Sequence, residues 1–204
     1  MPFDPILVQQ TPGFLSIEEG EHLFRLGCAA AAIAPCLEIG SYCGRSTVCL
    51  GLACRDAGQV LIAVDHHRGS EEQQPGEEYF DPALFDPASG RVDTLRRFRE
   101  TLARAGLEET VAPVVCGSAL AARAWSGPLG LVFIDGGHAA QSVQADYDGW
   151  SPRLPPGGLL VFHDVYPNPA DGGRAPYDVY RKALACGGFM PHSAVGSLAV
   201  LRRV

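Results

Sequence analysis

The stretch that decides the fold is residues 36–47, which read CLEIGSYCGRST. Cys36–Ile39 is predicted to be a short buried strand, and the residues after it turn into a helix. Gly40 and Gly44 let the joining loop approach a ligand closely, and the start of the helix offers free N–H groups. The loop lacks the G-x-G-x-x-G spacing of dinucleotide sites, and Glu38 would repel a pyrophosphate. It suits a cationic ligand, although a plain strand-to-helix turn would show the same glycines.

Strands and helices alternate on the C-terminal side of this loop. Apolar runs predict strands at 60–65, 111–115, 131–135 and 159–163, with a final strand pair at 189–192 and 197–201. Amphipathic or capped segments predict helices at 46–57, 91–105, 139–150 and 176–186. This alternation predicts an α/β fold with a mainly parallel sheet and helices on both faces. Ligands of such a sheet bind beyond the carboxyl ends of the strands.

The N-terminal segment is expected to belong to the same single domain, 1–204. Residues 1–15 contain three prolines and no periodicity, so they are expected to form an arm laid over the domain. Ser16 and Glu19 form a capping-box pattern that begins a helix, and Pro35 ends it.

Composition excludes several classes of function. The net charge is −7 and no basic stripe is visible, which argues against a nucleic-acid partner. No apolar segment is long enough to cross a membrane. The seven cysteines form no C-x-x-C pair, so we expect reduced thiols in a cytoplasmic protein, with neither disulfides nor a zinc site.

Polar residues follow the second and third predicted strands. Asp65 ends one of them and can accept hydrogen bonds from both hydroxyls of a ribose, or it caps a loop. Its neighbour His66 is included in the candidate site. Gly117 and Ser118 follow the next strand, where a short polar side chain can meet the edge of an adenine.

A second polar group follows the fourth and fifth predicted strands. Asp135 and His138 follow one strand, while His163 and Asp164 follow the other. Two carboxylates and two imidazoles at one sheet edge can bind a divalent cation or act as bases. In the plainer interpretation they are loop caps that hold the cleft open.

Segments 38–47, 135–138 and 157–164, together with Asp65, resemble the class I S-adenosylmethionine (SAM)-dependent methyltransferases. The resemblance is to the branch that holds macrocin-type O-methyltransferases and cephalosporin-biosynthesis methyltransferases. It implies a seven-stranded, Rossmann-like sheet with an antiparallel last strand, SAM as cofactor and a small-molecule acceptor. The cofactor residues that we expect are Glu38, Gly40, Ser41, Gly44, Ser46, Asp65, His66, Gly117, Ser118 and Asp135.

The resemblance also implies a metal site at Asp135, His163 and Asp164. Metal-using relatives carry acids at these positions, and His163 replaces one of them here. The exchange removes a formal charge, which weakens a preference for magnesium and suits a transition metal better.

Two kinds of function remain open. The first is methyl transfer, in which His138 or His163 takes the proton of an acceptor hydroxyl, or a metal at Asp135 and Asp164 lowers the pKa of that hydroxyl. The second is a SAM-binding sensor or partner protein without transferase activity. A nicotinamide oxidoreductase is disfavoured by the missing glycine pattern. We allow for a homodimer, which the sequence does not decide.

Two loops are expected to flank the cleft. The long connection 66–90 is either a lid or a mobile insertion, with Tyr79, Phe80 and Phe85 over an acceptor and the acids Glu71, Glu72, Glu77, Glu78 and Asp81 toward solvent. The second loop, 166–175, carries Asn168, Asp171 and Arg174. His22 and His67 are expected at the surface.

Overall fold

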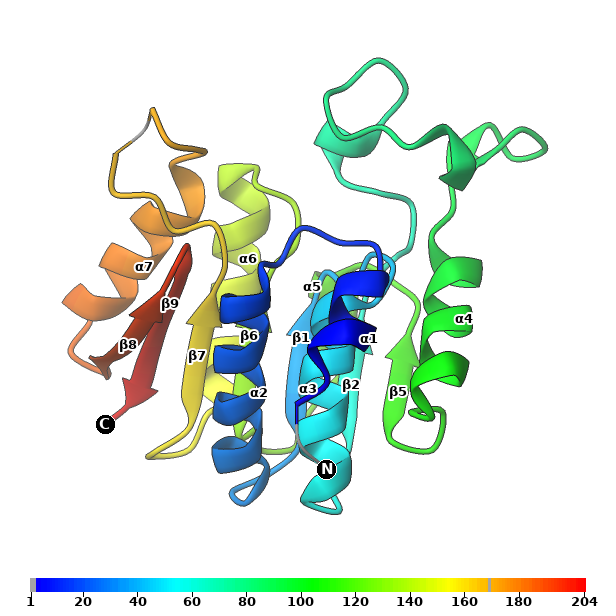
Figure 1. Ribbon diagram of the computed structural model, residues 1–204. Coiled ribbons are helices and arrows are strands. Elements are labelled where there is room, and N and C mark those ends of the chain that lie inside the picture. The colour runs from blue at the N-terminus through cyan, green and yellow to red at the C-terminus, as the bar shows by residue number, and fades with distance from the viewer. Residues whose placement is uncertain (1–2, 169) are drawn as a thin grey trace.

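A seven-stranded sheet forms the centre of the structure, a computed structural model that describes residues 3–168 and 170–204 (Figure 1). In spatial order its strands are β5 (Val111–Val114), β2 (Leu61–Val64), β1 (Cys36–Ile39), β6 (Leu131–Ile134), β7 (Leu159–Phe162), β9 (Leu198–Arg203) and β8 (Phe189–Val195). Neighbouring strands from β5 to β7 are parallel, whereas β9 is antiparallel to both β7 and β8. The predicted sheet with an antiparallel last strand is therefore confirmed.

Helices cover both faces of this sheet, so that its inner strands are buried on both sides (Figure 1). One face is covered by α1 (Pro5–Gln10), α2 (Ile17–Ala31), α3 (Arg45–Asp56) and α4 (Leu95–Ala105). The other is covered by α5 (Ser118–Ala124), α6 (Ala140–Trp150) and α7 (Ala175–Ala185). A short helix, η3 (Ser151–Arg153), follows α6. None of the described helices has the length and apolar character needed to cross a membrane.

The N-terminal arm is more regular than its sequence indicates. Pro5 occupies the first turn of α1, and the Asp4 side chain accepts a hydrogen bond from the Leu7 N–H at 3.0 Å. Val8 is fully buried against the core. The predicted capping box at the start of α2 is present: Ser16 and Glu19 exchange hydrogen bonds.

The helix expected over 91–105 begins later, at Leu95. Arg91–Val92 forms strand β4, which pairs with β3 (Phe85–Asp86) in a small antiparallel ribbon. Asp93 accepts from the Leu95 N–H at 3.0 Å just before the helix, whose N-cap residue is Thr94. Local hydrophobic spacing cannot distinguish this arrangement from one continuous helix, because a two-residue strand is too short to show a period of its own.

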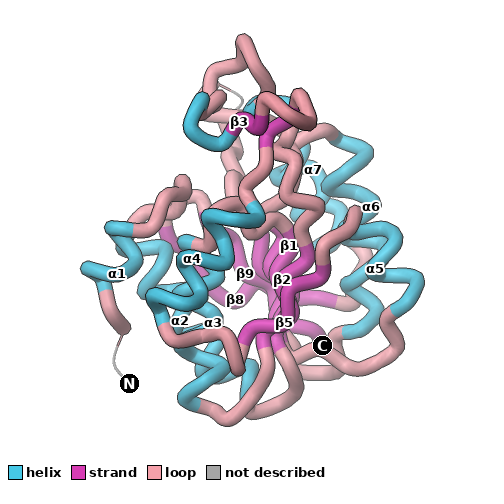
Figure 2. The backbone as a smooth tube through the Cα atoms, turned by 90° about the vertical axis from the view of Figure 1, so that its right-hand side faces the viewer, coloured by secondary structure: helices cyan, strands magenta, loops and turns pink. Residues whose placement is uncertain are grey.

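The connection between β2 and α4 stands above the sheet at the carboxyl ends of the strands (Figure 2). It contains two short helices, η1 (Glu71–Gln73) and η2 (Pro82–Leu84), as well as the ribbon. His67 anchors its base, correcting the expectation of a surface histidine: the residue is 2% exposed and its Nδ1 lies 2.7 Å from Thr94 Oγ1. Leu84 and Val92 pack with Cys43 of the glycine loop.

Candidate active site at the carboxyl edge of the sheet

The strand register brings the predicted site residues into one row. Val64, Ile39, Ile134 and Phe162 are register partners across β2, β1, β6 and β7. The next residue on each strand therefore emerges at the same edge of the sheet. These residues are Asp65, Gly40, Asp135 and His163. The sheet thus places a loop glycine beside two carboxylates and an imidazole.

The glycine loop after β1 depends on the absence of side chains at two positions. Gly40 has φ +86°, and a Cβ there would collide with the backbone carbonyl of Asp135. Gly44 has φ +98° and lies at the N-cap of α3. The two glycines let the loop pass close to the loop after β6 and then enter the helix.

Glu38 lies beneath this loop and does not line the cavity. Its carboxylate is fully buried and accepts hydrogen bonds from the hydroxyls of Ser41 (2.9 Å), Ser46 (2.6 Å) and Thr47 (2.6 Å). Burial raises the pKa of Glu38 to about 7, although the three hydroxyls oppose this change. The structure therefore places Glu38 under the loop, bonded to three of its hydroxyls, and not on the cavity wall where direct contact with a cationic ligand was expected.

Asp65 ties the loops after β1 and β2 together. Its Oδ2 accepts from the backbone N–H groups of Ser41 and Tyr42, each at 2.9 Å. Its Oδ1 accepts from the His67 N–H at 2.7 Å. Asp65 still lines the cavity, and the exposed His66 beside it does so as well.

The loop after β5 adds a third wall, where Gly117 caps α5 and Ser118 begins it. Ser118 Oγ accepts from Trp150 Nε1 at 2.8 Å. The neighbouring carboxylate of Asp146 is buried and lines the cavity. Burial raises the pKa of Asp146 to about 6, while a hydrogen bond from Ser118 opposes the change. Sequence reasoning missed Asp146; an acid on the inward face of the predicted helix was the available signal.

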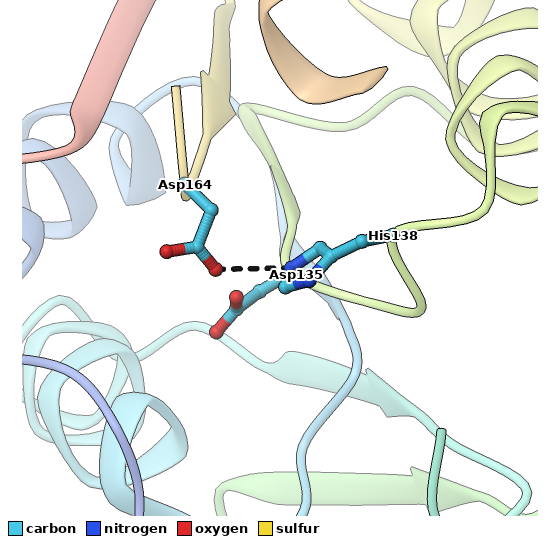
Figure 3. Close-up of side chains that lie close together, drawn as sticks. All are labelled: Asp135, His138 and Asp164. Carbon is cyan, nitrogen blue, oxygen red and sulfur yellow. Dashed lines mark ion pairs between the residues drawn. The ribbon is translucent and has the colours of Figure 1, made fainter. Parts of the chain in front are cut away.

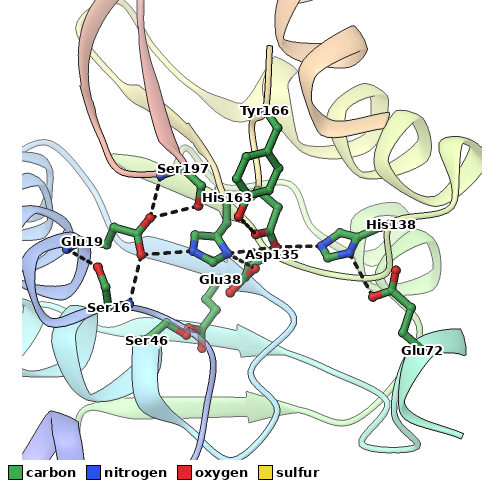
Figure 4. A network of polar contacts seen from close by, with 11 residues as sticks. Ser16, Glu19, Glu38, Ser46, Glu72, Asp135, His138, His163, Tyr166 and Ser197 are labelled. Carbon is green, nitrogen blue, oxygen red and sulfur yellow. Dashed lines mark hydrogen bonds and ion pairs between the residues drawn. The ribbon is translucent and has the colours of Figure 1, made fainter. Parts of the chain in front are cut away.

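His163 is enclosed by three carboxylates (Figure 4). It is 5% exposed, and its Nδ1 lies 3.0 Å from Asp135 Oδ1 and 3.1 Å from Asp164 Oδ2. Its Nε2 faces Glu19 Oε2 at 3.6 Å. Burial alone would lower the pKa of His163, but these carboxylates outweigh it and raise the pKa well above the usual range. Sequence reasoning missed Glu19, which reaches this position from α2.

His138, which lies close to Asp164 (Figures 3 and 4), is more exposed than His163, with 29% of its side chain accessible against 5%. Its Nε2 is 3.0 Å from Asp164 Oδ2, and its Nδ1 is 3.1 Å from Glu72 Oε2. The hydrogen bond with Asp164, more than any other contact, raises the pKa of His138 to about 9. Glu72 comes from η1, so the connection above the sheet contributes to the site.

Three of these side chains form a group that can hold a metal ion. Ligand atoms of Asp135, His138 and Asp164 all lie within 4.8 Å of one another (Figure 3). The sequence suggested His163 as the third ligand, but its imidazole is enclosed by carboxylates. His138 is more exposed and comes from a different strand end.

One cavity of about 1050 Å³ connects all of these loops. Tyr79 lines it as expected, whereas Phe80 packs on the Cys43 cluster instead. Glu71 and Glu72 also line the cavity, although Glu71 is exposed and the Glu72 side chain is 46% exposed, so the solvent-facing carboxylates that we expected border the site as well. On the opposite side, Tyr166 and residues 171–173 complete the wall.

Comparison with known proteins gives a consistent result. A family model described as a methyltransferase domain matches residues 37–165. The O-methyltransferase NovP is similar in structure, with a TM-score of 0.70 and 15% identity over 93% of this chain and 81% of that one. An O-methyltransferase from Bacillus cereus in complex with SAH gives a TM-score of 0.64 and 18% identity over 100% and 93% of the two chains. Cofactor-bound Rv0187 from MTB gives a TM-score of 0.63 and 19% identity over 97% of this chain and 86% of that one. At these identities the structural likeness concerns the fold.

Proposed function

This chain belongs to the methyltransferase-domain family, the class I SAM-dependent methyltransferases, and from that premise we propose that it methylates a hydroxyl oxygen of a small molecule. The observation that carries the proposal is the shared cavity, in which the cofactor loops meet the His138–Asp164 pair. Bound SAM supplies a methyl group on a positively charged sulfur. The likeness to the macrocin-type branch remains part of the proposal.

The cofactor half of the cavity fits SAM by the chemistry of its donors and acceptors. The loop that carries Gly40, Ser41, Gly44 and Ser46 holds the methionine end, where the first turn of α3 offers its backbone N–H groups. Glu38 acts from below by fixing the hydroxyls of that loop.

The nucleoside end fits the loops after β2 and β5. Asp65 Oδ1 accepts one N–H and keeps a lone pair for a ribose hydroxyl, with His66 at the rim. Gly117 and Ser118 border the adenine position, and the buried Asp146 carboxylate can accept from the exocyclic amine.

His138 is the proposed general base. Glu72 holds its Nδ1 and thereby orients Nε2 toward Asp164 inside the cavity. The neighbouring carboxylates raise the pKa of His138 to about 9 and so favour the protonated imidazole at neutral pH. A cationic ligand nearby disfavours that proton, so His138 becomes a better acceptor when the cofactor half is filled.

His163 has a positioning role in this proposal rather than the role of base. Its Nδ1 faces Asp135 and Asp164 together, and little of the ring reaches the cavity. The buried imidazole holds the two carboxylates at a fixed separation beside His138.

A divalent ion is a second route to the same deprotonation. Asp135, His138 and Asp164 offer two carboxylate oxygens and one imidazole nitrogen, a donor set that suits a transition metal. A metal held there would lower the pKa of an acceptor hydroxyl. We expect chelation to abolish turnover and added manganese or zinc to restore it. Undiminished turnover after exhaustive chelation would remove the metal from the mechanism and leave His138 as base.

The alternative function is SAM binding without transfer, as in a sensor. The proposal of catalysis is supported by His138 and Asp164, because binding alone needs no proton acceptor beside the cofactor loops. We also propose a cytoplasmic location, supported by seven free cysteines.

The direct test is labelled methyl transfer. The purified protein is incubated with methyl-¹³C SAM and the low-molecular-mass fraction of a cell extract. We expect a ¹³C resonance of an O-methyl ether, formed together with S-adenosylhomocysteine (SAH), and its loss in His138→Gln. An N-methyl product would contradict the hydroxyl target, and SAH binding with no labelled product would favour the sensor.

A further inference from the structure

The part of the cavity beyond the cofactor loops has a one-sided charge pattern. Seven carboxylates line the whole cavity, on residues Asp65, Glu71, Glu72, Asp135, Asp146, Asp164 and Asp171. Among the described lining residues there is no lysine, and Arg45 is the only arginine. Arg45 donates from Nε to the Thr11 carbonyl at 2.7 Å and from Nη1 to the Leu15 carbonyl at 3.0 Å. The imidazoles of His138 and His163 are also on this cavity, but each is already paired with carboxylates, so an anionic acceptor would meet no uncommitted cation among the described lining residues.

Five of these seven carboxylates belong to the cofactor half or are paired with histidines. Asp65 and Asp146 belong to the cofactor half, while Asp135, Asp164 and Glu72 face histidines. The side chains of Glu71 and Asp171 have no hydrogen-bond or ion-pair partner within residues 3–168 and 170–204. Two negative charges thus remain for a ligand.

Three aromatic rings, which we call the aromatic wall, lie on the same cavity: Phe14, Tyr42 and Tyr79. The Phe14 ring centroid is 5.5 Å from that of Tyr42 and 5.2 Å from that of Tyr79. Phe14 is 57% exposed and Tyr79 is 45% exposed, large fractions for aromatic side chains that contact one another. Their open faces offer an apolar surface with negative electrostatic character.

Glu71 lines the same cavity as the proposed base and the aromatic wall. A Cβ built on Gly137 would lie 3.0 Å from Glu71 Oε2, which places this carboxylate beside the loop that carries His138. The next residue, Glu72, accepts a backbone hydrogen bond from the Tyr79 N–H at 3.1 Å. One connection thus brings the Glu71 carboxylate beside the His138 loop and also holds the backbone of Tyr79.

We propose that the methyl acceptor is a ring compound that carries a protonated amine, with its hydroxyl at His138, its ammonium at Glu71 and its ring on the aromatic wall. The inference rests on the proposed methyl transfer and specifies its substrate class. Carboxylates and aromatic faces both attract a cation, whereas a carboxylate or phosphate on the acceptor would be repelled by the same groups. The same charges disfavour phosphorylated acceptors and coenzyme A thioesters.

The test uses three phenols that share a ring and a hydroxyl: tyramine, tyrosol and 4-hydroxyphenylacetate, whose side chains end in an ammonium, a hydroxyl and a carboxylate. Binding of SAH alone is first measured by calorimetry, and the SAH-saturated protein is then titrated with each phenol. We expect tyramine to bind about tenfold more tightly than 4-hydroxyphenylacetate, with tyrosol between them. Glu71→Gln should reduce that ratio to about threefold or less, and Phe14→Leu should weaken binding of all three.

Glu78→Gln is the matched control, because Glu78 lies on the same connection but does not line the cavity. In this variant the ratio of the affinities for tyramine and 4-hydroxyphenylacetate should equal that of the parent protein. Equal or tighter binding of the carboxylate probe would overturn the inference, as would a ratio that Glu71→Gln leaves unchanged. Binding of SAH with no binding of any phenol also overturns the inference and leaves the proposed function intact. Failure to bind SAH in the first step instead contradicts the proposed function.

Discussion

The two halves of the cavity are built in different ways. In the cofactor half, polar groups are hydrogen-bonded to one another before any ligand binds. Glu38 accepts hydrogen bonds from three hydroxyls, and Asp65 accepts hydrogen bonds from three backbone N–H groups. In the acceptor half, Glu71, Tyr79 and Asp171 are exposed and come from long connections. The difference indicates that cofactor geometry is preorganised by the strand ends, whereas acceptor geometry is set by loops that a ligand can rearrange.

The strongest test of this division separates turnover from cofactor affinity. Asp164 has φ +55°, a conformation that asparagine tolerates, so Asp164→Asn should fold while losing the charge that holds His138. We expect kcat to fall by roughly 10²- to 10⁴-fold, with SAH affinity changed by less than about threefold because Asp164 lies outside the cofactor half. Asp148→Asn, on the exposed side of α6, is the control. A parallel loss of turnover and SAH affinity would show that the two halves are not separate.

A second test concerns the buried support under the glycine loop. The pKa of Glu38 is about 7 in the folded protein and near 4.5 in a solvated glutamate. Between these values the folded state keeps a proton that the unfolded state releases, so this group's contribution to stability decreases as pH rises from 4.5 to 7. The decrease is roughly 3 kcal/mol.

The glutamine in Glu38→Gln cannot titrate, so the variant should not lose this stability as pH rises. The difference in free energy of unfolding, variant minus parent, should therefore increase by about this amount over the same pH window. Urea unfolding at a series of pH values measures the difference. Glu100→Gln, which removes an exposed ion pair with Arg96, should show no such trend. A difference that stays constant across the window would mean that Glu38 is not buried as the structure has it.

The same contrast explains what could be predicted from the sequence. Each predicted parallel strand is present, with ends shifted by at most a residue or two, because a buried strand reads as an apolar run between turn residues. Asp65, Asp135 and His163 could be placed at one edge because parallel strands end together. The apolar run in the sequence marks each buried strand, and the turn residues that follow it mark where the strand ends.

The missing parts depend on contacts between distant segments. Nothing local shows that Glu19, from α2, reaches His163, or that Glu72, from η1, pairs with His138. His67 was expected at the surface because its neighbours are polar, yet Thr94 and Phe98 bury it. Glu38 was expected to meet the ligand, but the three hydroxyls that follow it in sequence enclose its carboxylate.

The adenine edge of the cofactor half gives a smaller effect. If Asp146 accepts from the exocyclic amine, the protein should prefer SAH to S-inosylhomocysteine, in which that amine is replaced by an oxygen. We expect Asp146→Asn to weaken the binding of SAH about tenfold, since a charged acceptor is lost. The ratio of the affinities for SAH and S-inosylhomocysteine should fall as well. Competition binding measures both ligands. A variant that retains the full preference would exclude Asp146 from adenine recognition.

The acceptor half should show its looser construction in hydrogen exchange. Residues 71–79 lie on a largely exposed part of the connection between β2 and α4. His67, where this connection begins, and Leu84, which packs with Cys43, are buried. We expect 71–79 to exchange fastest in the free protein and to slow when SAH and an acceptor are both present. Slow exchange across this segment without ligand would contradict the expectation that this connection is a lid or a mobile insertion.

The central claim, that the cofactor half holds SAM, is tested most directly by calorimetric titration of the purified protein with SAH and, separately, with NADH. The account predicts that SAH binds, that NADH does not, and that Asp65→Ala weakens SAH by roughly 1–3 kcal/mol through the loss of charge-assisted hydrogen bonds. Binding of NADH with no binding of SAH would contradict it.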